Sequence, residues 1–593
     1  MTGWFDPSQL LHTGIQALVS KVIGAHSDRR LIEALGRHDH GYYDYTCHFS
    51  ARSFLEPDVA RPRSELWIDF VADTGDGWNP TYAVARAVAQ PRLRVSDGDT
   101  VHETERGALL VFGGDEVYPT PSRAAYERRL VAPYAAAFGD DRPAEAPHVL
   151  AIPGNHDWYD SLVAWSRLFC SSVTGRRFAG WRTHQARSYF ALKLPQGYWL
   201  FGADGQLQSD IDQGQIEYFR NIAERHMRGG ERVILCLASP GWIYAAKYAK
   251  YGEYDEADLI YLLKQILEPQ CVSVQVFLSG DLHHYRRHEE LAPRHPEAPV
   301  QKITAGGGGA FAHPTHGEDV DEIVEQSERA DAPGRRFALR AAFPSAATSR
   351  WLALRNLLFP FLNPWFGVVP ATLYLLAAWV MGATLHWQAP RNLFDPLLQT
   401  ARAFRDNPAV FLAFASVLGG FVFFTDTHSR LYKWLGGLAH AFAHYAALFY
   451  IGWGSAFFVY SLFPASPFLQ LALGATLVFW AGWTSGSLIV GVYLLVSFSV
   501  FGRHSEEAFA SLRIQDHKNF LRIHIGQDGA LTLYPIGLDR VPRRWRARRE
   551  DESRETPSAF VPDDPKASAP RLIEKPIVLR APAKPDGPRP AGP

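Results

Sequence analysis

The feature that most constrains this chain is a succession of four apolar segments in its last 230 or so residues, none of which contains Asp, Glu, Lys or Arg. About twenty such residues are enough for a helix to cross the hydrocarbon core of a bilayer. Four such helices buried in succession inside a soluble domain would be unusual. We therefore expect four membrane spans, or five if the last segment breaks near Gly482 to Gly486. The segments are 366–386, 409–425, 434–463 and 468–501.

Basic residues flank these segments unevenly, and this predicts an orientation. With four spans, the arginines before the first segment, Arg430 and Lys433 between the second and third, and Arg503 after the last all fall on one side. The positive-inside rule places that side in the cytoplasm. We therefore expect an integral membrane protein with its N-terminal part and C-terminus in the cytoplasm. The arginines before the first segment are Arg335, Arg336, Arg340, Arg350 and Arg355, and they are opposed by Arg391, Arg402 and Arg405.

The composition narrows the class of protein further. The formal net charge is -1 over 593 residues, so no basic excess indicates nucleic-acid binding. The four cysteines, Cys47, Cys170, Cys236 and Cys271, lack the spacing of metal ligands, and this favours free thiols in a reducing compartment.

The N-terminus shows no charged stretch leading into the apolar core of a cleavable signal peptide. It carries instead apolar residues at helical spacing, among them Leu10, Leu11 and Ile15. We expect an amphipathic helix whose apolar face packs on the following domain, and docking to a membrane surface is the alternative.

Between residues 59 and 330, strands and helices are expected to alternate as in a layered α/β fold. Four apolar stretches there each end in a turn that carries oxygen or imidazole side chains. Taken alone, each turn is explained by ordinary turn chemistry, a surface cluster or part of a metal site. Together they place such groups at the carboxyl ends of strands, where open α/β sheets have their sites. They are 66–72 before Asp73, 108–112 before Gly114-Asp115, 148–152 before Gly154-Asn155-His156-Asp157, and 272–278 before Gly280-Asp281-Leu282-His283.

This ordered set resembles the motifs of the calcineurin-like metallophosphoesterase superfamily, over roughly residues 60 to 316. The resemblance implies a β-sandwich flanked by helices and one or two divalent metal ions, without distinguishing Mn, Fe, Zn or Mg. Such metals activate a water and stabilise both oxygens of a phosphoryl transfer. By resemblance, Asp73 and His283 bind the first metal, Asp115 bridges and Asn155 binds the second. His156, with Asp157 beside it, serves catalysis by stabilising phosphoryl charge or protonating the leaving oxygen.

The chain also departs from the family pattern. Where many relatives have Asp-x-His, it has Asp73-Thr74-Gly75, so one ligand of the first metal is missing. The spacing Gly114-Asp115-Glu116-Val117-Tyr118 looks like that of purple acid phosphatases, in which the Tyr binds iron. Tyr118 is therefore a candidate replacement ligand, and a packing residue is the alternative.

The second metal site departs further. Ala238-Ser239-Pro240 stands where a His usually precedes the Pro, and Asp281 replaces the first His of Gly-His-x-His. A carboxylate is a suitable ligand for a hard cation, so Asp281 is a substitute candidate. The site is weak, is empty, or recruits one of three nearby histidines, namely His284, His313 and His316. A run of four glycines, 306–309, is either a phosphate-facing loop or a flexible connector.

The expected organisation is an N-terminal helical segment (1–58), a metallophosphoesterase domain (59–330), a linker (331–365), an all-α transmembrane domain (366–502), a β-hairpin segment (503–548) and a disordered tail (549–593). The expected function is hydrolysis of a phosphoester substrate by metal-activated water at a membrane, where a lipid-linked phosphate is a candidate. The alternative is a catalytically degenerate domain that acts as a binding or regulatory module. A third interpretation, a transporter regulated by this domain, is disfavoured by the lack of charges within the apolar segments.

Overall fold

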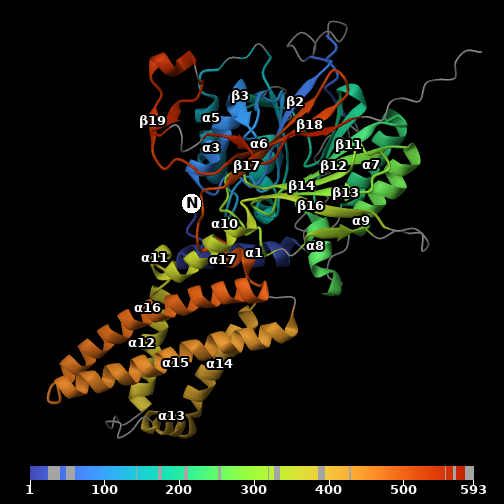
Figure 1. The fold of residues 1–593 in the computed structure, drawn as a ribbon. Helices are drawn as coiled ribbons and strands as arrows, with labels where there is room; N and C mark the ends of the chain where they lie inside the picture. Colours follow the sequence, from blue (N-terminus) through green and yellow to red (C-terminus); the bar gives the residue numbers. More distant parts are fainter. Residues whose placement is uncertain are drawn as a thin grey trace, which may run out of the picture. The chain divides into compact units, whose positions relative to one another are not determined.

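The computed structural model divides the chain into two compact units. We call the first the sheet unit (Met1–Thr2, Thr13–Ala346 and Ile514–Pro593) and the second the helix unit (Gly3–His12 and Ala347–Arg513). Each is described by itself (Figure 1). The structure describes all residues except 25–40, 49–60, 142, 144, 171–175, 206–210, 252–255, 318–319, 326–333, 385–393, 426–428, 555, 565–568 and 581–593.

The first nine-stranded sheet of the sheet unit follows the order β1-β9-β10-β11-β12-β14-β13-β16-β15. Strands β10, β11, β12 and β14 run parallel, and the edge beyond β14 is antiparallel. The bounds are β1 (Tyr43–Asp44), β9 (Phe190–Leu194), β10 (Tyr198–Ala203), β11 (Arg232–Leu237), β12 (Ser273–Ser279), β13 (Tyr285–Leu291), β14 (Gln301–Ala305), β15 (Glu322–Val324) and β16 (Arg336–Phe343).

The second large sheet follows the order β21-β18-β17-β2-β5-β6-β8-β7. Its centre consists of three parallel strands, β2 (Leu66–Val71), β5 (Leu109–Gly113) and β6 (His148–Ile152). These strands are almost wholly buried, and their sequences are therefore nearly continuous apolar runs. At one edge lie β7 (Arg176–Phe178) and β8 (Trp181–Thr183). At the other lie β17 (Lys518–Ile525), β18 (Leu531–Leu538) and β21 (Arg571–Leu572), with β22 (Ile577–Leu579) also pairing β18.

The main core lies between these two sheets. Side chains of one sheet, such as Ile68 and Val111, share a single buried cluster with those of the other, such as Leu200, Ile234 and Leu278. Helices cover the outer faces: α3 (Trp78–Ala89) and α5 (Ala132–Phe138) share a cluster with the second sheet, and α7 (Gln213–His226) shares one with the first. The coarse prediction of a mixed α/β part followed by a helical part is confirmed.

The segment after the apolar helices forms the expected hairpin, β17 and β18, and it pairs directly with β2 in register Leu521↔Phe70 and Ile523↔Ile68. The prediction of a disordered tail from 549 is wrong for the described residues. Strand β20 (Phe560–Pro562) pairs with β19 (Trp545–Ala547), and β21 and β22 complete the sheet next to β18. The hydrogen bonds of this sheet edge order a sequence that composition alone predicts to be unstructured.

The helix unit has fewer membrane-length helices than predicted. Among the described residues, α15 (Arg430–Leu462) and α16 (Pro467–Phe501) are long and apolar enough to cross a membrane, and a third span exists if α13 (Asp395–Asp406) and α14 (Pro408–Phe424) count as one, although they bend by 106°. Helix α12 (Val368–Thr384) is shorter. The expected four spans, or five, are therefore not reached by length. Helix α16 continues unbroken through Gly482 and Gly486.

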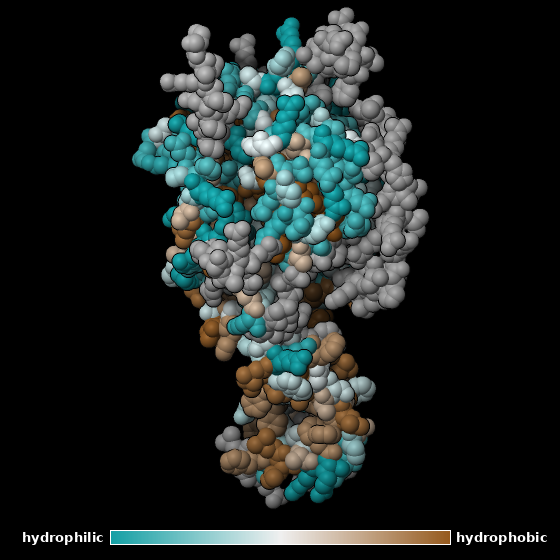
Figure 2. All heavy atoms as spheres, turned by 90° about the vertical axis from the view of Figure 1, so that its right-hand side faces the viewer, coloured by the Kyte–Doolittle hydropathy of each residue, from teal (hydrophilic) through white to brown (hydrophobic). Residues whose placement is uncertain are grey.

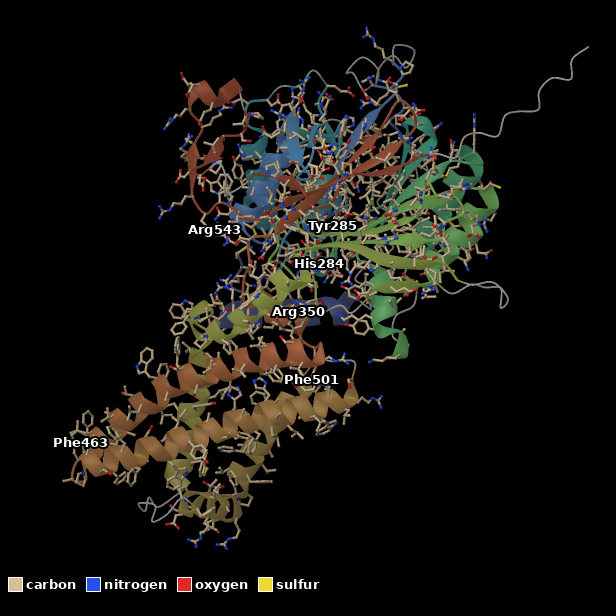
Figure 3. All side chains as sticks on the ribbon, viewed as in Figure 1. His284, Tyr285, Arg350, Phe463, Phe501 and Arg543 are labelled. Carbon is tan, nitrogen blue, oxygen red and sulfur yellow. The ribbon has the colours of Figure 1, made fainter. Side chains whose placement is uncertain are left out.

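Figure 3 labels Phe463, just after α15, and Phe501, the last residue of α16, at opposite ends of this helix pair. The surface of the helices is largely hydrophobic (Figure 2). Between α12 and α15, the Tyr374 hydroxyl lies 2.8 Å from Nδ1 of His444, so this intramembrane histidine joins an interhelical hydrogen bond.

The topology of the sheet unit restricts the number of membrane crossings. Strand β2 precedes every apolar helix and β17 follows them all, yet the two are hydrogen-bonded neighbours in one sheet. Both flanks of the helical region must then lie on the same side of any membrane that it crosses. The number of crossings between these two strands is therefore even, so a count of three is excluded. If α15 and α16 both cross, α12 must cross whenever the pair α13–α14 does.

Candidate functional site

Four side chains meet where β2, β5 and β12 end. Asp73 follows β2, Asp115 follows β5, and Tyr118 lies three residues later; His283 follows β12. Because β2 and β5 are parallel neighbours, their carboxyl ends open at one edge of the sheet. Asp73 and Asp115 both have a positive φ, 58° and 54°. Such left-handed backbone at a non-glycine residue costs about 1 kcal/mol or more and is typical of functional turns.

The Tyr118 hydroxyl lies at the centre of this group. It is 2.7 Å from Oδ1 of Asp73, 3.1 Å from Oδ2 of Asp115 and 2.9 Å from Nε2 of His283. A hydroxyl has a single proton to donate, whereas ionised carboxylates and an unprotonated imidazole nitrogen only accept. When both carboxyl groups are ionised, one donor faces three acceptors, and the cluster then needs positive charge or protons from elsewhere.

His283 presents its acceptor nitrogen to this cluster. Its Nδ1 lies 2.8 Å from the carbonyl oxygen of Phe311, and a carbonyl only accepts, so Nδ1 carries the proton. In the neutral ring Nε2 is then a lone pair, directed at the Tyr118 hydroxyl. Burial, reinforced by the neighbouring His313, lowers the pKa of His283 well below its usual value, which keeps the ring neutral. An orienting carbonyl behind a histidine is the usual support of a metal ligand.

The two carboxyl groups of the cluster are held in place by backbone donors. The amide of Asp281 donates to Oδ2 of Asp73, and the amide of His156 donates to Oδ1 of Asp115, both at 2.8 Å. Burial raises the pKa of Asp73 and of Asp115 well above the usual range, and the charges of nearby carboxylates raise them further. The site thus concentrates acidic groups where water does not screen them.

These observations test whether a cation fits. Within the described ranges, no group of three or more His, Cys, Asp or Glu side chains is arranged as a ready metal site, so ligation remains a prediction. The donor set nevertheless suits a cation: two carboxylates, one phenol and one imidazole lone pair converge with an excess of acceptors. Asp73, Asp115, Tyr118 and His283 are accordingly the residues that would hold one.

The turn after β6 divides into a half-buried and a buried part. Asn155 and His156 are half-buried, with Nδ1 of His156 donating to the carbonyl of Pro119 at 2.7 Å and its ring 4.5 Å from that of Tyr118. Asp157 is fully buried and accepts from the amides of Gly154 and Glu116 and from the Tyr126 hydroxyl. The carboxylate of Asp157 therefore orients the turn, and His156 is the member that can reach a reacting group.

The candidates for the second metal are more scattered. Asp281 is half-buried at the end of β12, and its Oδ2 accepts from the Tyr244 hydroxyl at 2.6 Å. His313 stacks on the ring of His283, with centroids 3.9 Å apart, so its ring lies parallel to that ligand candidate. Burial lowers the pKa of His313 to about 3 and that of His284 well below its usual value. His284 is fully buried, and His316 is half-buried.

The glycine run packs too tightly to be a flexible connector, and the alternative of a phosphate-facing loop stays a prediction. All four glycines are buried, and a Cβ on Gly306 would lie 2.4 Å from Oδ2 of Asp73, while one on Gly307 would lie 2.1 Å from Nδ2 of Asn519. The amide of Ala310 donates to the carbonyl of Asp73 at 2.9 Å. The run is glycine because its backbone packs directly against the Asp73 side of the site.

The sequence analysis did not identify two residues that contact this site. Lys518, the first residue of β17, is fully buried and donates its ammonium to the carbonyl of Ala310 at 2.6 Å; the amide of Asn519 donates to the carbonyl of Gly307 at 3.0 Å. Burial lowers the pKa of Lys518 to about 8. No motif marks them, because their partners lie some two hundred residues earlier in the chain. Because the sequence does not show that this lysine is buried, it offered no signal for either residue.

Comparison with known proteins adds weak likenesses. No family model and no curated protein matches the chain. Matching solved structures include GAP50, the anchor in the inner membrane complex of Plasmodium (12% identity, TM-score 0.29, covering 42% of this chain and 74% of that one). They also include the purple acid phosphatase PPD1 from yellow lupin seeds (12%, 0.27, 46% and 47%) and PhoD (11%, 0.28, 42% and 58%). The chain spans about half the length of the last two, and no TM-score reaches 0.5.

Proposed function

We propose that this chain is a membrane-anchored, metal-dependent phosphoesterase. The observation that carries the proposal is the convergence of Asp73, Asp115 and His283 on the Tyr118 hydroxyl, with three acceptors around one donor. In a purely structural core, buried polar groups are expected to find enough hydrogen-bond partners among one another. In a site that is completed by a cation, the cation takes the place of the missing donors.

In this proposal each residue has a defined task. Asp73, Asp115, Tyr118 and His283 hold the first cation, which when bound supplies an activated water and charge stabilisation for phosphoryl transfer. Asp115 would be the carboxylate shared with a second cation; its Oδ2 faces the Tyr118 hydroxyl, and its Oδ1 accepts from the amide of His156. Asn155 and Asp281 are the proposed ligands of a second cation, with His284, His313 and His316 as reserve candidates.

His156 is the proposed proton carrier. Its Nδ1 donates to the carbonyl of Pro119, so Nε2 is the nitrogen that gains and loses a proton. Burial lowers the pKa of His156, and this keeps a neutral form available at neutral pH. We assign to this Nε2 the transfer of a proton to or from the phosphoryl group or its leaving oxygen. Asp157 serves by orienting the turn.

The proposed location follows from the helices and the charges. The two membrane-length helices support a membrane location, and the pairing of β2 with β17 supports an arrangement in which both flanks of the helical region lie on one side. The positive-inside rule makes that side the cytoplasm. A phosphoester at the membrane surface, with a lipid-linked phosphate as the leading candidate, is the proposed substrate.

A second candidate function is supported by specific residues. Ser239 and Asp281 stand at the family's ligand positions, and the Asp281 carboxylate is engaged by Tyr244. If the second cation is absent, the domain would bind a phosphorylated ligand without hydrolysing it. This alternative predicts ligand binding that depends on one metal, with no turnover.

Turnover separates the two functions. The full chain, purified in detergent, is assayed with an aryl phosphate monoester and diester in the presence of Mn²⁺, Zn²⁺, Fe or Mg²⁺. We expect hydrolysis of at least one ester, abolished in Asp115→Asn and retained in Asp99→Asn, which removes an exposed carboxylate far from the strand ends. No hydrolysis of either ester with any metal would favour the binding module.

A further inference from the structure

The segment that leads into α12 buries three polar side chains and exposes several large apolar ones. It consists of α10 (Ala346–Ala353), a 3-10 turn (Leu354–Leu358) and α11 (Phe359–Leu362). Ser349, Asn356 and Asn363, each seven residues apart, are almost completely buried. In a water-soluble helix the buried face would be the apolar one.

The inner polar face is satisfied by the residues after α16. The hydroxyl of Ser511 donates to Oδ1 of Asn356 at 2.9 Å, and Nδ2 of Asn363 donates to the carbonyl of Ser511 at 3.0 Å. Phe359 is fully buried and lies against Gly491 of α16, where an added Cβ would be 2.7 Å from the Cβ of Phe359. The orientation of this segment is therefore fixed by specific contacts inside the helix unit.

The outer face is a continuous apolar stripe. Its members recur at intervals of three and four residues, the spacing of one face of a helix. Their exposed fractions are 75% for Trp351, 44% for Leu354, 49% for Leu358, 76% for Phe361 and 68% for Trp365. An exposed apolar stripe of this size, running over α10, the 3-10 turn and α11 to Trp365, marks a binding surface.

The N-terminus extends the same surface. The ring of Phe5 packs edge-on against Phe359 and Phe366, at 5.1 Å and 5.7 Å between centroids, and so joins residues 3–12 to this segment. Leu10 and Leu11 of α1 (Pro7–Gly24) are nevertheless 43% and 67% exposed. These two leucines therefore add to the exposed apolar surface of the helix unit.

The residue types on this exposed apolar surface favour lipid as its binding partner. The stripe runs without interruption into the apolar helix α12. Trp351 and Trp365 are of the residue type that concentrates at the boundary between headgroups and acyl chains. Arg350, labelled on α10 in Figure 3, and Arg355 are exposed beside the stripe and suit lipid phosphates.

We propose that residues 3–12 and 347–365 form a lipid-binding platform, which lies in the bilayer at the depth of the headgroup–acyl boundary, on the side where the chain enters α12. Most of the segment expected to be a linker, 331–365, then belongs to the membrane anchor. The proposal is independent of catalysis at the strand ends.

Site-specific fluorescence in lipid nanodiscs tests this platform. The four native cysteines are replaced by alanine, and an environment-sensitive fluorophore is attached to a cysteine introduced at Phe361, Leu358 or Leu11 in separate variants, so that a poorly folded one does not decide the outcome. Phe442→Cys on α15, at a position 73% exposed, is the lipid control, and Val101→Cys in the sheet unit, at a position 57% exposed, is the water control.

We expect lipids with a shallow nitroxide quencher to quench the platform probes several-fold more than they quench the Val101 probe. Lipids with a deep nitroxide quencher should quench the platform probes less than the shallow ones do. Aqueous iodide should quench them several-fold less than it quenches the Val101 probe. Strong iodide quenching at all three positions would overturn the proposal. Protection from both iodide and lipid quenchers would also overturn it, because another protein surface would then cover the stripe.

Discussion

The ion pair that joins the hairpin after the helices to the strand before them offers a quantitative test. Arg522 of β17 and Asp69 of β2 are both buried, with Nε–Oδ1 at 2.7 Å and Nη2–Oδ2 at 3.2 Å. Arg522 also donates to the Thr104 hydroxyl at 3.0 Å and to the carbonyl of Val88 at 3.2 Å. Arg522→Met leaves the Asp69 carboxylate buried with only the amide of Gly107 as a donor, at 2.9 Å.

Removing one partner of such a pair costs about 3–5 kcal/mol, a large part of the roughly 5–15 kcal/mol that stabilises a domain. With a slope of about 3 kcal/mol/M, the urea midpoint should fall by about 1 M or more. The assay is urea unfolding followed by tryptophan fluorescence. Arg571→Met is the matched control, because it breaks the exposed pair with Asp539 and should cost less than about 1 kcal/mol.

Arg522→Met combined with Asp69→Leu should regain much of the loss, since no lone charge remains buried. If Arg522→Met cost no more than Arg571→Met, the hairpin would not be bound to β2 as described. The inference that the chain crosses the membrane an even number of times would then lose its basis.

Three further predictions concern the site and its surroundings. His156→Ala should slow turnover at least about 100-fold while the metal content is unchanged, because general acid–base catalysis contributes on that scale; single-turnover kinetics with elemental analysis would reveal an error if the full rate persisted. Lys518→Met removes the donor to the Ala310 carbonyl, so metal affinity measured by titration should fall about tenfold, on the scale seen for groups that support ligands, whereas equal affinity would show that this donor does not position the site. Burial lowers the pKa of His148 to about 3, so the stability that the neutral ring contributes is present above pH 6.5 and is lost as the pH falls towards 3, at up to about 1.4 kcal/mol per pH unit. Urea unfolding at pH 7 and pH 5 should therefore show a smaller loss of stability for His148→Gln than for the natural chain. An equal loss in both would refute this prediction.

The strand ends of the site were predictable because the physics is local. An apolar run that stops at Asp73 or Asp115 must be a buried strand followed by a turn, and parallel strands bring such ends to one edge. The central position of the Tyr118 hydroxyl was less accessible, because the spacing after Asp115 fits a ligand and a packing residue equally well. Its three short contacts became visible only in the fold, and metal ligation by Tyr118 stays a prediction.

Features that depend on distant partners could not be predicted. Lys518 reaches Ala310 across 208 positions, and the tail after 549 is ordered by pairing with β18 and β19. The structure also has fewer membrane-length helices than the four apolar segments predicted, among the residues that it describes. Apolar composition shows which segments are excluded from water. Whether such a segment is long and straight enough to cross a membrane depends on its helices, here on the 106° bend between α13 and α14 and on the shorter α12.

Metal stoichiometry tests the central claim most directly. The full chain, purified in detergent, is stripped with a chelator, loaded with Mn²⁺ or Zn²⁺ and analysed for bound metal, beside Asp115→Asn and the control Asp99→Asn. We expect at least one tightly bound metal per chain, which is lost in Asp115→Asn and retained in Asp99→Asn. No bound metal in the natural chain, or equal binding by Asp115→Asn, would contradict it.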